Sequence, residues 1–147
     1  MSLANVFKPS PKQEGFWQQI GIPSRGPKLY KALHEGLPFS IYGKLAKISG
    51  LERTELACAA VIASATLQRR SKSGKFNTDE SDRLYRFAKV FKAALDLFDG
   101  EQKTTTNWLK GRVHGLGNKA PIEMLSTAAE TEAVLNLIGQ LEHGVFA

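Results

Sequence analysis

The stretch that decides the fold is residues 78–100, with the sequence TDESDRLYRFAKVFKAALDLFDG. Its apolar residues recur in steps of three and four, which is the spacing of one face of an α-helix. Three acidic residues fall in the first turn, where the helix dipole favours negative charge. We expect Thr78 to cap this helix and Asp99-Gly100 to close it. The expected apolar face consists of Leu84, Phe87, Ala88, Phe91, Ala94, Leu95 and Phe98.

Helical patterns continue on both sides of this stretch. Upstream, prolines precede two apolar stripes of helical spacing, and Gly36 and Gly50 are expected to close those helices. Alternating runs typical of strands are nearly absent, so the sequence predicts an all-α fold. Further helices are expected over residues 51–60 and 64–72, around Trp108, after Pro121 and from Val134 to Leu141.

The chain is expected to divide into three segments. Proline, glycine and polar residues near the start indicate that residues 1–20 form a flexible N-terminal tail. Residues 21–100 are expected to hold a helix-turn-helix domain, whose long helix serves as core or as a dimerisation surface. Residues 101–147 are expected to form a second, small helical domain.

Charge is distributed unevenly along the 147 residues, whose formal net charge is +6. Residues 64–92 carry eight Lys and Arg against three Asp and Glu, whereas residues 93–147 carry four against seven. A basic middle joined to an acidic end indicates two surfaces that meet different partners. The absence of a long apolar run and of a signal-peptide pattern predicts a cytoplasmic protein with no membrane partner.

Residues 51–72 have the spacing of a helix-turn-helix, a unit that presents its second helix to the major groove of DNA. Arginine and glutamine can pair with guanine and adenine, and lysines near the helix end suit phosphate contacts. The alternative is an ordinary helical hairpin with a solvated basic face. The predicted DNA-binding residues are Ser64, Thr66, Gln68, Arg69, Arg70, Lys72 and Lys75.

Sites of other kinds find little support. The three histidines are scattered, and Cys58 is the only cysteine, so we expect no metal site, no disulfide and no catalytic residue. We interpret Cys58 as a packing residue. The Gly115-Leu116-Gly117 run follows no strand and is not a dinucleotide-binding motif. We therefore expect neither an enzyme nor a cofactor.

Several longer motifs resemble a known family. The run GLPFSIYGKLAKISGLERTEL from Gly36, followed by GKFNTDESDRLYRFAKVF from Gly74, resembles the Xre-type helix-turn-helix of bacterial antitoxins. The later motifs WL, LGNKAPIEML and VLNLIGQLEHGVFA resemble the toxin-binding domain named after Xre, MbcA and ParS. The resemblance covers roughly residues 20–147.

The resemblance implies an antitoxin of a type II toxin–antitoxin module. Its partner would be a RES-domain toxin encoded nearby, of a class that resembles ADP-ribosyltransferases and depletes NAD, so that NAD would be a ligand of the toxin alone. The C-terminal domain would inhibit the toxin, and the helix-turn-helix would bind the operator DNA and repress the operon. The implied toxin-binding residues are Trp108, Leu109, Glu142, His143, Gly144, Val145, Phe146 and Ala147.

Three departures from the family pattern bear on local structure. Val61 replaces the glycine of the turn, and a valine cannot adopt a left-handed conformation cheaply, so we expect a different or distorted turn. Arg112-Val113 stands where Pro-Asn is usual, and Thr131 stands where a glycine is usual. These two departures affect the loop and the start of the last helix, and they leave the identity of the domain unchanged.

Two questions stay open at this level. The apolar end Gly144–Ala147 either inserts into the toxin's active-site cleft or folds back onto the last helix. The chain itself is a dual-role antitoxin, or a stand-alone transcriptional regulator with a C-terminal dimerisation domain, or a toxin-binding protein with a vestigial helix-turn-helix. We expect a homodimer within the toxin complex, and DNA binding would also require a dimer.

Overall fold

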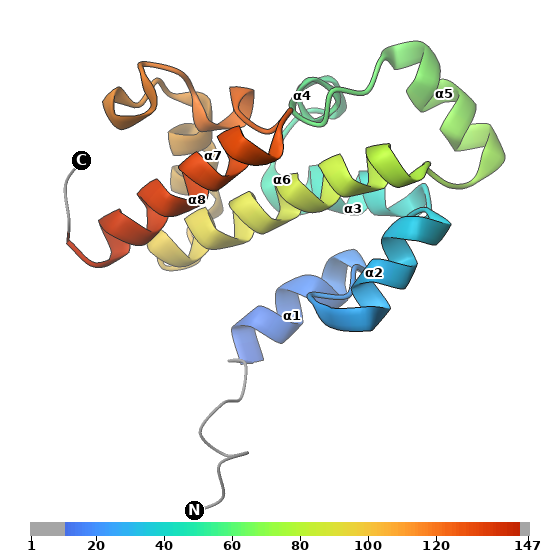
Figure 1. Ribbon diagram of the computed structural model, residues 1–147, viewed down its shortest axis with the longest axis horizontal. Coiled ribbons are helices and arrows are strands. Elements are labelled where there is room, and N and C mark those ends of the chain that lie inside the picture. Colours follow the sequence, from blue (N-terminus) through green and yellow to red (C-terminus); the bar gives the residue numbers. More distant parts are fainter. Residues whose placement is uncertain (1–10, 145–147) are drawn as a thin grey trace, which may run out of the picture.

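The computed structural model describes residues 11–144, with side chains from Gly15 onward. Within that range the chain is all-helical, as predicted, with eight α-helices and short 3-10 turns (Figure 1). The helices are α1 (Pro11–Ile20), α2 (Gly26–Glu35), α3 (Ser40–Ser49), α4 (Arg53–Ala59), α5 (Ser64–Ser73), α6 (Thr78–Leu97), α7 (Gln102–Lys110) and α8 (Ala128–Glu142). The 3-10 turns η2 (His114–Leu116) and η3 (Pro121–Glu123) connect α7 to α8.

The long helix α6 begins with a reciprocal cap. The side chain of Asn77 accepts a hydrogen bond from the amide of Glu80 at 2.8 Å, and Glu80 accepts one from the amide of Asn77 at 3.0 Å. The predicted cap, Thr78, is instead the first helical residue. The difference is physical, because Asn77 has the extended backbone that a capping residue requires.

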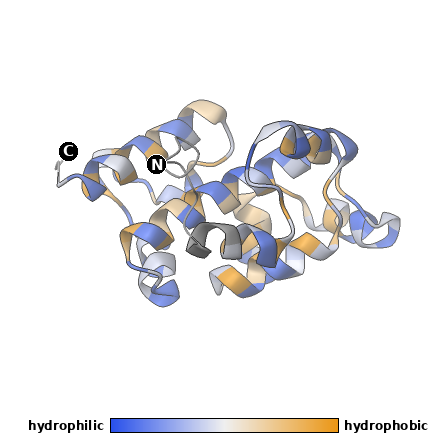
Figure 2. Cartoon of the chain, turned by 90° about the horizontal axis from the view of Figure 1, so that it is seen from below, coloured by the Kyte–Doolittle hydropathy of each residue, from blue (hydrophilic) through white to orange (hydrophobic). Residues whose placement is uncertain are grey.

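Helix α6 lies at the centre of the core. Helix α8 packs along it, while α2 and α3 contact its other sides (Figure 1). Phe87 and Phe91 of its apolar face stack with ring centroids 6.0 Å apart. One continuous cluster of buried residues runs from Phe16 to Ile138, so the two expected domains share a core through α6. Figure 2 shows hydrophilic and hydrophobic residues alternating along the helices, as amphipathic packing requires.

The expectation of a flexible tail is wrong for residues 11–20, which form helix α1. Phe16 and Ile20 lie one turn apart and are 4% and 0% exposed, and Phe16 stacks on Phe91 at 6.1 Å. Burial of these two apolar side chains outweighs the polar composition around them. The first ten residues of the predicted tail lie outside the described residues.

A close backbone approach joins the segment between α2 and α3 to the segment between α5 and α6. Gly36 has a φ of +95°, and a Cβ built there would lie 2.0 Å from the carbonyl oxygen of Phe76. The amide of Phe76 donates to the carbonyl of Leu37 at 2.9 Å, and the amide of Phe39 donates to the carbonyl of Gly74 at 2.8 Å. Only glycine fits at position 36 without displacing the backbone.

Helix α5 and the C-terminal end of α8 lie at opposite ends of the long axis of the molecule (Figure 1). In the described part of the chain no helix is both long enough and apolar enough to cross a membrane.

Candidate DNA-binding and toxin-binding surfaces

The turn between α4 and α5 keeps a left-handed residue despite the loss of glycine. Val61 has a φ of +55° and its side chain is 53% exposed, while its neighbours Ala60 and Ile62 are buried. The turn therefore keeps its left-handed residue, and the expected distortion takes the form of backbone strain at Val61. The strain arises because a β-branched side chain crowds its own backbone at positive φ. The buried neighbours hold the turn in place.

Helix α5 has no buried residue, and it projects from one end of the molecule (Figure 1). Its half-buried Leu67 faces the body, so helical spacing places Ala65, Arg69 and Lys72 on the outward face. The predicted contacts Ser64, Gln68, Arg69, Lys72 and Lys75 are all exposed, and Thr66 is half-buried. Ser64 is the first residue of the helix, and the N-cap residue is Ala63, which makes no side-chain capping hydrogen bond.

Two of the predicted DNA contacts bond to each other. A terminal nitrogen of the Arg69 guanidinium donates to Oγ1 of Thr66 at 3.2 Å, one turn earlier on the helix. This bond restricts the exposed arginine side chain and so lowers the entropy lost when the guanidinium binds.

Arg70 differs from the other predicted contacts, because its guanidinium is already paired within the chain. Its Nε lies 2.7 Å from Oε1 of Glu80, and its Nη2 lies 3.1 Å from Oε2 of the same carboxylate. Burial acts to raise the pKa of Glu80, but hydrogen bonds from Arg70 and from the Asn77 amide outweigh it and hold that pKa below its usual value. Arg70 therefore joins α5 to α6.

The C-terminal half begins with α7, which carries two predicted toxin contacts. Trp108 is half-buried, and its ring lies 6.0 Å from that of Phe98. Leu109 is 2% exposed and belongs to the continuous core, so it has no surface to offer a toxin. Its predicted contact role is wrong for the folded chain, because adjacent helical residues point in different directions.

The end of α8 offers the remaining described contacts. Glu142, His143 and Gly144 are exposed, and Gly144 has a φ of +74°. The other predicted contacts, Val145, Phe146 and Ala147, lie outside the described residues.

Comparison with known proteins finds two matched domains in the chain. A family model described as the antitoxin Xre-like helix-turn-helix domain matches residues 28–89. A second, described as the antitoxin Xre/MbcA/ParS C-terminal toxin-binding domain, matches residues 93–144. A Photorhabdus laumondii protein named antitoxin Xre is 40% identical over 144 residues, covering 95% of this chain and 97% of its own length. A Yersinia enterocolitica protein of the same name is 35% identical over 141 residues, covering 95% of each.

The chain belongs to the Xre antitoxin family. Members of this family are antitoxins and not enzymes. The boundary between the two matched domains falls near residues 89–93, inside α6. The helix that fills the core of the Xre-like domain therefore also supports the toxin-binding domain.

Both further departures from the family pattern are accommodated in this Xre antitoxin. Val113 pairs with Lys119 across the loop, with the Val113 amide 3.1 Å from the Lys119 carbonyl. Thr131 is buried, and its Oγ1 donates to the carbonyl of Thr127 at 2.9 Å. The threonine hydroxyl is thus satisfied within the first turn of α8.

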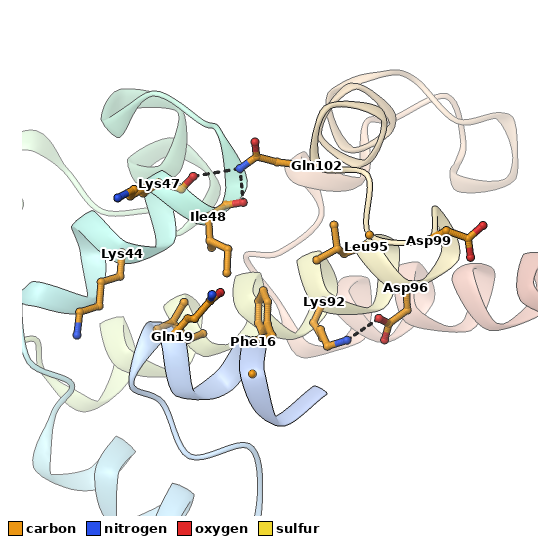
Figure 3. A pocket seen from close by; sticks show the side chains of 13 residues that line it. Phe16, Gln19, Lys44, Lys47, Ile48, Lys92, Leu95, Asp96, Asp99 and Gln102 are labelled. Atoms are coloured by element: carbon orange, nitrogen blue, oxygen red, sulfur yellow. Dashed lines mark hydrogen bonds and ion pairs between the residues drawn. The ribbon is translucent and has the colours of Figure 1, made fainter. Parts of the chain in front are cut away.

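A cavity of about 1050 Å³ lies where α1, α3 and the end of α6 meet in the antitoxin (Figure 3). Phe16 lines it, Lys44 and Lys47 of α3 lie along one side, and Asp96 and Asp99 lie along the other. Sequence reasoning missed this cavity because α1 was expected to be a tail. The spacing of Phe16 and Ile20 was the signal that could have revealed it.

Other candidate chemistry is sparse in the described part of the antitoxin. No group of three His, Cys, Asp or Glu side chains there could hold a metal ion. Cys58 is exposed, so its predicted packing role is wrong.

Proposed function

We propose that this chain neutralises a RES-domain, NAD-depleting toxin through its C-terminal half and represses its own operon through α5. It would do so in the cytoplasm, where the toxin is made and its substrate is present. The observation that carries this proposal is the separation of the two surfaces along the long axis of the molecule (Figure 1). One chain can then hold a toxin at one end and DNA at the other.

Charge and exposure support the DNA-binding part of the proposal. Arg69 and Lys72 lie on the outward face of a projecting helix, and Lys75 follows that helix. Arg69 would pair with a guanine edge, while the two lysines would contact phosphates and set the position of the helix. A homodimer would place two such helices about 34 Å apart on one side of the duplex.

The exposed end of α8 supports the toxin-binding part. Residues 93–147 carry more acidic than basic side chains, and the family model that matches there is a toxin-binding domain. The half-buried Trp108 and the exposed Glu142 and His143 are the described residues that would contact the toxin. Residues 145–147 would extend that contact into the active-site cleft.

Co-expression with the product of the adjacent gene tests the toxin-binding part directly. A tag on this chain should retain the neighbouring protein, and growth should recover relative to cells that express the neighbour alone. A neighbour that is expressed and toxic but neither retained nor neutralised would contradict the proposal. The stand-alone regulator would then be the better interpretation.

A further inference from the structure

The residues ESDRL at positions 80–84 lie in the first two turns of α6, and four of the five are polar or charged. Glu80 and Ser81 are nevertheless buried. Buried polar groups are retained where they satisfy specific hydrogen bonds. The Oγ of Ser81 accepts a hydrogen bond from the amide of Leu37 at 2.8 Å. Glu80 and Arg83 instead make their hydrogen bonds with α5 and with the turn before it.

Arg83 bonds to the turn that precedes α5. Its Nε donates to the carbonyl of Ala60 at 2.7 Å, and its Nη2 makes a longer, 3.4 Å contact with the carbonyl of Val61. These carbonyls belong to the left-handed turn, so the guanidinium fixes the strained backbone at the point where the chain enters α5.

Glu80 bonds to the second half of α5. Both of its carboxylate oxygens accept hydrogen bonds from Arg70, two turns into α5. Paired bonds of this kind fix direction as well as distance. The first two turns of α6 therefore hold α5 at two points, its entry and its second half.

Helix α5 has few other attachments. None of its ten residues is buried, and only Leu67 gives it an apolar contact with the core. A ten-residue helix is marginal by itself, and a helix that buries little apolar surface gains little orientation from packing. The polar contacts from α6 must supply what packing does not.

We propose that Glu80 and Arg83 are positioning residues that set the orientation of α5 for DNA recognition, Glu80 through Arg70 and Arg83 through the turn carbonyls. This inference rests on the proposal that α5 binds DNA. Bidentate contacts with base edges depend steeply on angle, whereas phosphate contacts tolerate a helix that moves. Loss of either residue should therefore cost sequence selectivity more than it costs non-specific binding.

The test compares Glu80→Gln with the wild-type chain on two duplexes. One duplex is selected from a random library by the wild-type chain, and the other is a scrambled sequence of equal length. The amide oxygen of the introduced glutamine can still accept a hydrogen bond from the Asn77 amide, so the substitution removes the charge and keeps the cap. We expect affinity for the selected duplex to fall about tenfold, with scrambled binding and toxin neutralisation unchanged.

Asp79→Asn is the matched control, because Asp79 is an exposed carboxylate in the same helical turn. It should leave selectivity unchanged. The double variant with Arg70→Ala and Glu80→Gln should lose no more selectivity than Arg70→Ala alone, because Glu80 acts through Arg70. Additive losses would contradict that route, and equal loss of neutralisation would show a general weakening of the fold.

Amide hydrogen exchange needs no DNA, so it tests the positioning of α5 independently of the proposed function. In Glu80→Gln and in Arg83→Ala the amides of α5 should exchange about tenfold faster while those of α8 stay unchanged. Arg83→Lys, which keeps the positive charge but has a single donor nitrogen, should show a smaller effect than Arg83→Ala. If the wild-type chain selects no duplex, the DNA-binding proposal is wrong, and exchange alone decides whether α6 positions α5. Unchanged α5 exchange would overturn the inference.

Discussion

The Nζ of Lys110, at the end of α7, lies 2.7 Å from Oε2 of Glu55 in α4, and the two residues belong to different halves of the chain. The side chains of Gln102 and Thr106 precede Lys110 by two turns and one turn of α7. They donate to backbone carbonyls at the end of α3, including that of Ser49. The last carbonyls of an α-helix have no amide partner four residues later inside that helix, although the carbonyl of Lys47 also accepts a hydrogen bond from the amide of Gly50 at 3.3 Å. Helix α7 thus caps α3, and the helix-turn-helix and the toxin-binding half are joined by polar contacts as well as by the core.

Acidification should weaken that connection. The hydrogen bond from Lys110 holds the pKa of Glu55 below its usual value of 4.5. A lowered pKa stabilises the folded chain above the unfolded-state pKa, and this contribution is lost as pH falls through the folded-state value. The free energy of unfolding should therefore fall from about pH 5 downward, and Glu55→Gln should make that fall shallower. Because the pair is partly exposed, we expect at most about 1 kcal/mol.

Urea unfolding at a series of pH values measures this effect. Glu132→Gln, which removes an exposed carboxylate from α8, is the control and should leave the slope unchanged. An identical pH slope in Glu55→Gln and the wild-type chain would mean that the Lys110 pair contributes nothing.

Replacing Val61 with glycine should stabilise the chain. The side chain is mostly exposed, so little burial is lost, and glycine adopts the left-handed conformation without steric cost. The gain should be about 1 kcal/mol, the difference between relieved strain and the entropy of the glycine. Thermal unfolding should show a higher Tm for Val61→Gly and a smaller increase for Val61→Ala, which loses the branch but keeps the Cβ. A lower Tm for the glycine variant would contradict the strain at this turn.

Gly36→Ala should destabilise the chain by roughly 3 kcal/mol, because the new Cβ would meet the carbonyl of Phe76, a backbone atom that cannot swing aside. Gly117→Ala is the matched control. Gly117 has a φ of +68° but open space around its Cβ position, so it should cost only the backbone strain, about 1 kcal/mol. Equal losses for the two variants in urea unfolding would show that the close approach is unimportant.

The sequence predicted most of the fold because its helices carry local signals. The apolar spacing of α6 and the stop at Gly50, which has a φ of +72°, were both confirmed. Position-specific contacts could not be predicted in the same way. The pairing of Arg70 with Glu80 and the burial of Leu109 depend on which face of a helix meets which neighbour, and this is decided only when the helices pack.

If α5 binds DNA, replacing Arg69 should weaken DNA binding without changing toxin neutralisation. Arg69→Ala should weaken binding to a selected duplex by about tenfold and relax base preference at one position. Toxin neutralisation should be unchanged, because α5 lies at the far end of the molecule from the end of α8 (Figure 1). Lys103→Ala removes an exposed positive charge from α7 and is the control for binding. Fluorescence anisotropy across a salt series would measure both variants.

Deleting residues 143–147 tests how the C-terminal end acts on the toxin. If this end enters the active-site cleft, the truncated chain should still retain the toxin on a tag, because Trp108 and α8 remain, but should no longer restore growth. Binding to the selected duplex should persist, since α5 is untouched. The truncation ends at Glu142, the last residue of α8, so the helix is kept whole. Full growth rescue by the truncated chain would instead favour an end that folds back onto α8, with inhibition supplied by the helical surface alone.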